Sequence, residues 1–448
     1  MNQFTHSALC WLESILQERF GHSFTVCQQA HALLLELPGR KGEIRFDNQQ
    51  TVFHQSRSDF PCKHWQASAE GFQAPIKDAI PAPSIGELPA PLIEVGERGA
   101  TIHYDILGLT YWMLTRLEEV GRTDLDNHQR FPATSSHAYN HGYLERPVLD
   151  EWLMILGQVI QRVWPQLELK QHKYSIKVSH DVDRPSRYGF RSLKPLIRAM
   201  AGDVLKYRNI QGALIAPWVR LNTKQQLHLA DPFNTFDWLM DVSEANNLKS
   251  AFYFICGRTN PAKDADYEPE HPAIRNLMRR IHDRGHEIGL HPSYGTFQKP
   301  ELIAQECERL KRICSEEGIQ QSEWGGRMHY LRWEQPTTMR AWSDAGMTYD
   351  STLGYADRPG FRCGTCHEYP AFDPIAQEPL SLRIRPLIVM EGTIISPQYL
   401  GLGQSKAFRK ITKLKEYCEK MDGQFTLLWH NSEFLFDENR DTYSELLK

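Results

Sequence analysis

The chain has 448 residues, of which 41% are hydrophobic and 24% are charged, and its formal net charge is −4. A chain of this length and composition can bury a large core in two or three domains, and it is not collagen-like, mucin-like or disordered. The near-neutral charge gives no basic field for nucleic acid, and no apolar run is as long as a membrane-spanning helix.

The N-terminal residues 1–21 lack a basic segment followed by an apolar one, so they do not predict a signal peptide. The nine cysteines are an odd number and are scattered along the chain. In a long chain without an export signal they indicate reduced thiols rather than a disulfide framework. We therefore expect a cytoplasmic protein.

Residues 1–165 predict a small α+β domain ahead of the rest of the chain. Apolar residues at helical spacing favour a first helix, with Thr5 as its cap. The following stretch is proline-rich and contains short strand-like pieces. The expected elements in chain order are a helix over 6–19, short strands within 25–104, helices over 105–122 and 147–164, and a linker over 164–173.

From residue 170 to residue 448, strand-like runs alternate with amphipathic helices, which predicts a parallel α/β fold. A barrel and a doubly wound sheet both fit, although fewer than eight clear strands argue against a regular eightfold barrel. Strands are expected at 175–181, 250–257, 286–292, 382–390 and 424–431, and helices over 273–285, 301–318 and 408–423.

A basic insertion interrupts this pattern at 184–224. It contains nine lysines and arginines but a single acid, Asp203. One interpretation is a solvated helical excursion. The other is a site for an anionic ligand, such as a diphosphate-linked glycan, or for the face of a membrane.

Four polar residues stand at the carboxyl ends of expected strands: Asp181, Asp183, His291 and His430. In parallel α/β folds, ligands and catalytic groups gather at that edge. Side chains alternate along a strand, so Asp181 and Asp183 point to the same side. Two close carboxylates repel unless a cation or a proton lies between them. A divalent metal would hold one and leave the other as a base; alternatively, the pair only caps a turn.

Two loop motifs could also carry chemistry. In the glycine-containing segment 325–330, the Arg327 guanidinium could clamp a carboxylate and the His329 imidazole could be a ligand. The motif Cys363-x-x-Cys366-His367 matches both a haem-attachment and a redox pattern. Covalent haem attachment belongs to exported proteins, and the sequence predicts no export signal. A redox pair usually stands at the start of a helix that follows a strand, which the flanking residues do not predict. The favoured interpretation is therefore a loop with two buried thiols.

Taken together, residues 175–435 resemble the polysaccharide deacetylases, the family 4 carbohydrate esterases with a NodB-homology domain. Four segments carry the resemblance, in the family's order: HDVD at 180–183, GHEIGLHP at 285–292, GGRMHY at 325–330 and LLWHN at 427–431. The resemblance implies a distorted (β/α) barrel over 170–448, preceded by the smaller α+β domain as an accessory module.

The resemblance also implies roles for these side chains. Asp181 would be the base, oriented and kept ionised by Arg327, and His430 would be the general acid. Asp183 and His291 would be metal ligands.

Two features depart from the family's pattern. The first motif usually has adjacent aspartates, whereas here Val182 separates them. The second motif usually has another histidine four residues after His291, where this chain has Gly295. His329 is the hypothesised replacement ligand. Without a third ligand, the chain would instead be a non-catalytic glycan-binding or assembly protein with a degenerate deacetylase barrel.

The function implied by the resemblance is a metal-dependent hydrolase that removes an N-acetyl, or less favourably an O-acetyl, group from a sugar. Zinc is the expected ion, because catalytic zinc sites use such ligands and keep an open position. The expected partner is an acetylated glycan, anionic or lipid-linked, of the kind used in lipopolysaccharide or capsule assembly. Peripheral membrane contact is expected, and nucleic acid is not.

Overall fold

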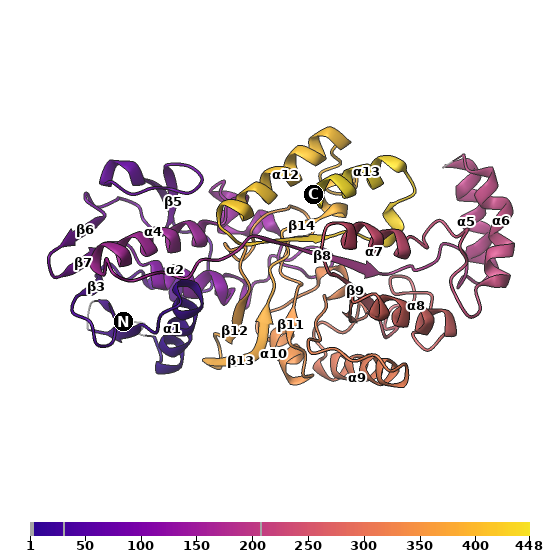
Figure 1. Ribbon diagram of the computed structural model, residues 1–448, viewed down its shortest axis with the longest axis horizontal. Coiled ribbons are helices and arrows are strands. Elements are labelled where there is room, and N and C mark those ends of the chain that lie inside the picture. Colours follow the sequence, from indigo (N-terminus) through magenta and orange to yellow (C-terminus); the bar gives the residue numbers. More distant parts are fainter. Residues whose placement is uncertain (1–3, 30–31, 207) are drawn as a thin grey trace.

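The computed structural model describes residues 4–29, 32–206 and 208–448. Figure 1 shows the N-terminal elements at one end, a parallel sheet with its helices in the middle, and a hairpin of two helices at the other end. This confirms the expected mixed α/β class. None of the helices in these ranges is both long enough and apolar enough to cross a bilayer.

The N-terminal part contains a five-stranded sheet with the order β1-β2-β3-β7-β6, in which β3 and β7 pair parallel and the other neighbours pair antiparallel. Thr5 caps the first helix as predicted, since its side chain accepts the Ala8 N–H at 3.2 Å. The helix expected over 105–122 ends early, because Arg116 has a left-handed φ of 51°. The elements are α1 (His6–Phe20), β1 (Thr25–Gln28), β2 (Leu33–Glu36), β3 (Glu43–Phe46), β4 (Cys62–Gln66), β5 (Ala79–Pro83), β6 (Ile93–Gly96), β7 (Gly99–Ile102), α2 (Ile106–Leu114), α3 (His137–Asn140) and α4 (Val148–Val163).

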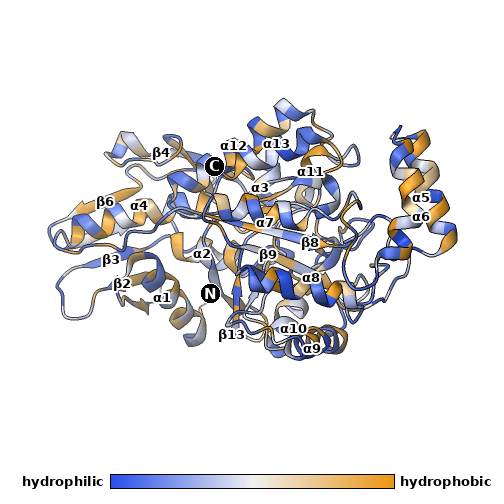
Figure 2. Ribbon diagram, turned by 45° about the vertical axis from the view of Figure 1, so that its right-hand side comes forward, coloured by the Kyte–Doolittle hydropathy of each residue, from blue (hydrophilic) through white to orange (hydrophobic). Residues whose placement is uncertain are grey.

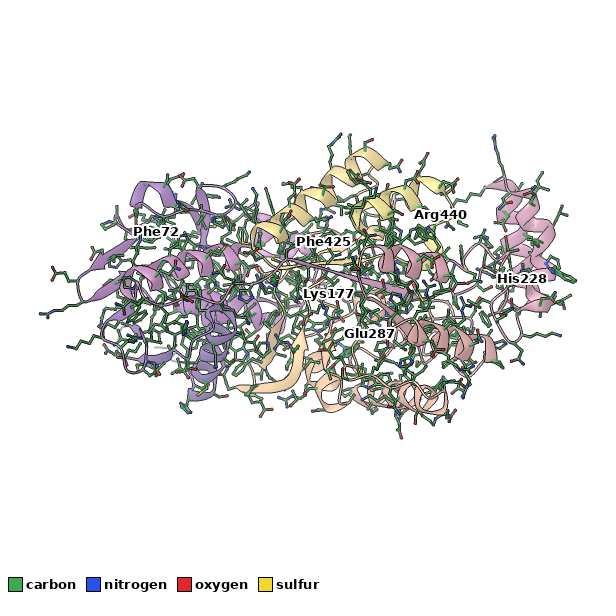
Figure 3. All side chains as sticks on the ribbon, viewed as in Figure 1. Phe72, Lys177, His228, Glu287, Phe425 and Arg440 are labelled. Carbon is green, nitrogen blue, oxygen red and sulfur yellow. The ribbon has the colours of Figure 1, made fainter. Side chains whose placement is uncertain are left out.

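The middle of the molecule is a five-stranded sheet with the order β10-β9-β8-β15-β14, and every neighbouring pair runs parallel. All five carboxyl ends therefore lie at one edge. Phe425 on β15, labelled in Figure 3, is fully buried in the core of this region. The strands are β8 (Ser175–Val182), β9 (Ser250–Ile255), β10 (Glu287–His291), β14 (Val389–Met390) and β15 (Gln424–Leu428). The helices are α5 (Leu193–Leu205), α6 (Ile210–Asn222), α7 (Phe236–Ala245), α8 (Pro272–Asp283), α9 (Pro300–Glu316), α10 (Thr337–Asp344), α11 (Glu391–Ile395), α12 (Gln404–Lys420) and α13 (Asp437–Leu446).

A third sheet continues from the β10 edge. It has the order β11-β13-β12, formed by β11 (Tyr349–Asp350), β12 (Tyr369–Asp373) and β13 (Glu378–Ile384), so the strand expected over 382–390 is divided between β13 and β14. Gly326 links the two sheets: it bridges to Leu290, and its carbonyl accepts the Ser351 N–H at 2.9 Å. A side chain at Gly326 would place its Cβ 1.9 Å from the Leu290 oxygen, so only glycine permits this approach.

The N-terminal part packs directly on the third sheet. The Trp11 indole donates to the Pro370 carbonyl at 3.0 Å, and Glu18 pairs with Arg383 at 2.9 Å. Buried apolar residues of both parts form one continuous core. The division at 165–170 stays a prediction, but the two parts share their packing.

The Cys-x-x-Cys-His loop is held by a buried carboxylate of α4. Asp150 accepts the Cys366 N–H and the Thr365 hydroxyl, each at 2.8 Å, and pairs with Arg19 of α1. Burial raises the pKa of the Cys366 thiol well above its ordinary value, and the His367 Nε2 bonds the Met421 carbonyl at 3.1 Å. Although Asp150, Cys366 and His367 lie within metal-binding distance of one another, both oxygens of Asp150 already accept hydrogen bonds from this loop. The loop therefore has a structural role.

Replacing Asp150 with alanine is expected to lower the free energy of unfolding by about 3–5 kcal/mol, because Arg19 would stay buried without its partner. Denaturant unfolding of the full chain measures this. The matched control is Glu18→Ala, which breaks a half-exposed pair one residue away and should cost about 0–1 kcal/mol. Equal effects of the two substitutions would contradict the structural role of Asp150.

Candidate metal centre

A cleft of about 880 Å³ lies at the carboxyl edge of the central sheet. Five of the six residues singled out from the sequence line it, and the sixth, Arg327, is fully buried beside it. In Figure 1 the arrow of β8 points towards the α5–α6 hairpin, and Lys206, which follows α5 (Leu193–Leu205), lines the cleft. The five lining residues are Asp181, Asp183, His291, His329 and His430.

Asp183, His291 and His329 form a tight cluster in the cleft. The Asp183 Oδ1 lies 3.2 Å from the His291 Nε2 and 3.5 Å from the His329 Nε2. One donor atom from each residue lies within 4.8 Å of the others. The Asp183 Oδ1 is buried and has no hydrogen-bond donor. A buried carboxylate oxygen in this position needs a proton or a cation.

A hydrogen bond at the Nδ1 of each ring fixes the orientation of the His291 and His329 imidazoles. The His291 Nδ1 lies 2.6 Å from the Arg327 carbonyl oxygen, and the His329 Nδ1 lies 3.2 Å from the Asp264 carboxylate. Since both partners only accept, each Nδ1 carries a proton, and once Nε2 is deprotonated its lone pair is directed towards Asp183. Three acceptors thus converge on one point, and this donor set fits a divalent metal.

The charges around the cluster agree with this interpretation. Burial alone would lower the pKa of His329, but the Asp183 and Asp264 carboxylates raise it to about 9. Burial alone would raise the pKa of Asp183, but His329 and His291 lower it well below its ordinary value. The carboxylates therefore attract positive charge to this point, and a metal ion would take the place of the proton on His329.

Asp181 lies beside the cluster and is held by Arg327. The Arg327 guanidinium donates to the Asp181 Oδ1 at 2.7 Å and to the Ser179 hydroxyl and the Ser351 carbonyl, each at 2.9 Å. The Asp181 Oδ2 lies 3.7 Å from the His291 Nε2. With Oδ1 bound by the guanidinium, Oδ2 is the oxygen directed towards the cluster and can accept a proton there.

His430 also faces the cluster. Its Nε2 lies 3.8 Å from the Asp183 Oδ2, and its Nδ1 bonds the buried carboxylate of Glu391, which also accepts the His430 N–H at 3.1 Å. Burial alone would lower the pKa of His430, but Glu391 raises it well above its ordinary value. His430 therefore holds a proton at neutral pH on the nitrogen that faces the cleft.

Glu391 and Asp264 were not predicted from the sequence. Glu391 directly follows β14, so the rule that identified the other strand-end residues could have found it. Asp264 lies in the loop after β9, nine residues beyond its end, and no local pattern marks it. Gly295, where a second-motif histidine was expected, donates its N–H to the Thr259 hydroxyl at 2.7 Å and offers no ligand.

The N-terminal part reaches the segment that carries His329. The Arg130 guanidinium donates to the Tyr330 carbonyl at 2.7 Å, and the Arg332 guanidinium donates to the His128 carbonyl at 2.9 Å. Tyr330 and the next residue have left-handed φ angles of 62° and 54°, which side chains rarely adopt. These contacts fasten a strained turn directly after His329, so the N-terminal part helps to shape the cleft.

The family model that matches this chain covers only its N-terminal part. Residues 2–165 match the model of a family of unknown function (DUF7033). No curated protein matches the chain. Three solved structures each match 62% of the chain: a protein described as a polysaccharide deacetylase from Mycobacterium smegmatis (15% identity, 84% of that chain, TM-score 0.40), PuuE allantoinase (10%, 83%, 0.37) and a protein described as a polysaccharide deacetylase from Pseudomonas aeruginosa PAO1 (15%, 84%, 0.36). These likenesses are distant, and the chemistry of the cleft rests on its own side chains.

Proposed function

We propose that the chain is a metal-dependent hydrolase that removes an acetyl group from an amino sugar. The observation that carries the proposal is the convergence of three acceptors, from Asp183, His291 and His329, between a carboxylate–arginine pair and a histidine–glutamate pair. The motif resemblance over 175–435 supplies the reaction class. We also propose that the linked sheets form the distorted (β/α) barrel of the deacetylase type.

Asp183, His291 and His329 would hold the ion, and zinc suits two imidazoles and one carboxylate. When bound, a divalent ion would lower the pKa of a bound water and polarise the acetyl carbonyl. The His291 and His329 rings are oriented for this role by their Nδ1 bonds, which also keep each Nε2 free of a proton once the ion is present.

Two further side chains would move protons. The Asp181 Oδ2 would accept the proton of the attacking water, and Arg327 would keep that carboxylate ionised and aimed at the cleft. His430 would give the proton of its Nε2 to the departing amine, and the Glu391 carboxylate keeps that proton available.

The lining of the cleft favours an anionic acceptor. Arg184 is exposed next to Asp183, and both Arg184 and Lys263 line the cleft. These cations suit a sugar that carries phosphate or another acid, such as a lipid-linked precursor of a surface polysaccharide. The nine free cysteines agree with a cytoplasmic site of action.

The test is metal analysis of the purified chain followed by assays for acetate release. We expect about one divalent ion per chain and release of acetate from N-acetylated, preferably anionic, oligosaccharides. Removal of the ion with a chelator should abolish release, and zinc should restore it. Release of acetate that persists at an undiminished rate in the metal-free chain would contradict the proposal.

The absence of a side chain at Gly295 favours a second candidate, a glycan-binding protein without catalysis. In that case the wild-type chain would bind acetylated oligosaccharides in calorimetry but would neither retain zinc after dialysis nor release acetate. Metal retention together with acetate release decides for the enzyme.

A further inference from the structure

The α5–α6 hairpin exposes an unusual amount of apolar surface. Figure 2 shows hydrophobic residues along both helices, which extend away from the rest of the molecule. Leu205 is 82% exposed and Leu214 is 76% exposed, although leucine is normally buried. The exposed large apolar side chains of this region are Leu193, Ile197, Val204, Leu205, Ile210, Leu214, Trp218, Leu221 and, just beyond the hairpin, Leu229.

Within α5 and within α6, these residues lie on one side of the helix. In α6, Ile210, Leu214, Trp218 and Leu221 follow the spacing i, i+4, i+8 and i+11, which places them on a single face. The opposite face of α6 is buried against α5 through small residues, and Leu196 of α5 packs on that face. The two helices of the hairpin therefore pack on each other through a small core of their own. The exposed apolar residues lie outside that core.

The charges around this face are almost all positive. Lys194, Arg198, Arg208 and Lys224 are exposed. The single acid of the insertion, Asp203, is buried and accepts the Tyr188 hydroxyl at 2.7 Å while pairing with Arg187. The hairpin thus presents leucine, isoleucine and tryptophan flanked by lysine and arginine, which is the composition of helices that lie in the interface of anionic membranes.

We propose that the α5–α6 hairpin docks the protein on an anionic lipid bilayer by inserting this apolar face among the headgroups. Exposed apolar side chains provide the first attraction and the surrounding cations provide the second, and the binding strength of an interfacial helix grows with both. A second copy of the chain is disfavoured as the occupant, because two hairpins face to face would bring like charges together.

Docking in this way also places the cleft at the membrane. Arg184 and Arg187, just before the hairpin, and Lys206, at the end of α5, line the same cleft as the candidate metal cluster. His228, which follows the hairpin, is labelled at that end of the molecule in Figure 3. The mouth of the cleft would face the headgroups, where a lipid-linked sugar would lie. The docking itself does not depend on the proposed catalysis.

The experiment is flotation of the full chain with vesicles of phosphatidylcholine alone or with about one third phosphatidylglycerol, at about 0.1 M salt. We expect binding to the anionic vesicles at least about tenfold tighter than to the neutral ones, and weaker binding at about 1 M salt. The variant Leu205→Ser/Leu214→Ser/Trp218→Ser should lose at least about tenfold in affinity for the anionic vesicles.

The matched control is Val95→Ser/Leu125→Ser/Ile375→Ser, which removes three exposed apolar side chains elsewhere and should bind like the wild type. Unchanged thermal unfolding and metal content would show that both triple variants are folded. Absence of wild-type binding to anionic vesicles, or equal binding by the hairpin variant, would overturn the proposal. So would a wild-type dimer, seen by light scattering, that the hairpin substitutions dissociate while no vesicle binding occurs.

Discussion

Substitution of His329 by alanine is expected to weaken zinc binding by at least about 100-fold. The Nε2 of His329 is one of the three acceptors that converge on the cluster, and Gly295 provides no side chain that could act as a ligand. With only Asp183 and His291 left, the site would hold two protein ligands. Calorimetric titration of the metal-free chain with zinc measures the change.

A graded series makes this test specific. Asp264→Asn keeps the His329 ring but weakens the contact that orients it, so zinc affinity should fall by about 10- to 100-fold. His128→Ala removes a nearby imidazole that bonds the Tyr294 hydroxyl at 3.0 Å and points to no acceptor of the cluster, so it should bind zinc like the wild type. Wild-type affinity in His329→Ala would exclude His329 from the ligand set.

The strand-end residues could be predicted because parallel strands bring their carboxyl ends to one edge. The pair Asp181 and Asp183 is more than 100 residues from His291, which in turn is more than 100 residues from His430. The structure places all four in one cleft. Their roles stay predictions. Glu391 obeys the same rule and could have been named, whereas Asp264 lies in a loop whose position depends on tertiary contacts alone.

Contacts between distant segments had no signal in the sequence. Arg130 reaches the Tyr330 carbonyl across 200 positions of the chain, and a lone arginine in a loop gives no indication of such a partner.

The α5–α6 hairpin shows a second limit of prediction from sequence patterns. Apolar residues spaced as in 210–221 predict a helix with one apolar face, but the same pattern describes a face that packs on a core and a face that is exposed. Burial distinguishes the two, and burial is a tertiary property.

Asp181→Asn is expected to reduce the rate of N-deacetylation by about 10³-fold while zinc content stays unchanged. The amide oxygen can still accept the Arg327 hydrogen bond made to Oδ1, so the side chain keeps its place. The amide NH₂ that replaces Oδ2 cannot accept a proton from water. Steady-state acetate release and metal analysis of the same samples separate a lost base from a lost ion.

His430→Gln provides the matched comparison, because the two residues serve different halves of the proposed reaction. An amine must be protonated to leave, whereas the phenolate of 4-nitrophenyl acetate leaves without a proton. The glutamine variant should therefore lose activity on the acetylated sugar but keep most of its activity on the ester. Asp181→Asn should lose activity on both, since each substrate needs an activated water. If Asp181→Asn hydrolysed the ester at the wild-type rate, Asp181 would not be the base, and equal losses on both substrates in His430→Gln would remove His430 from the role of acid.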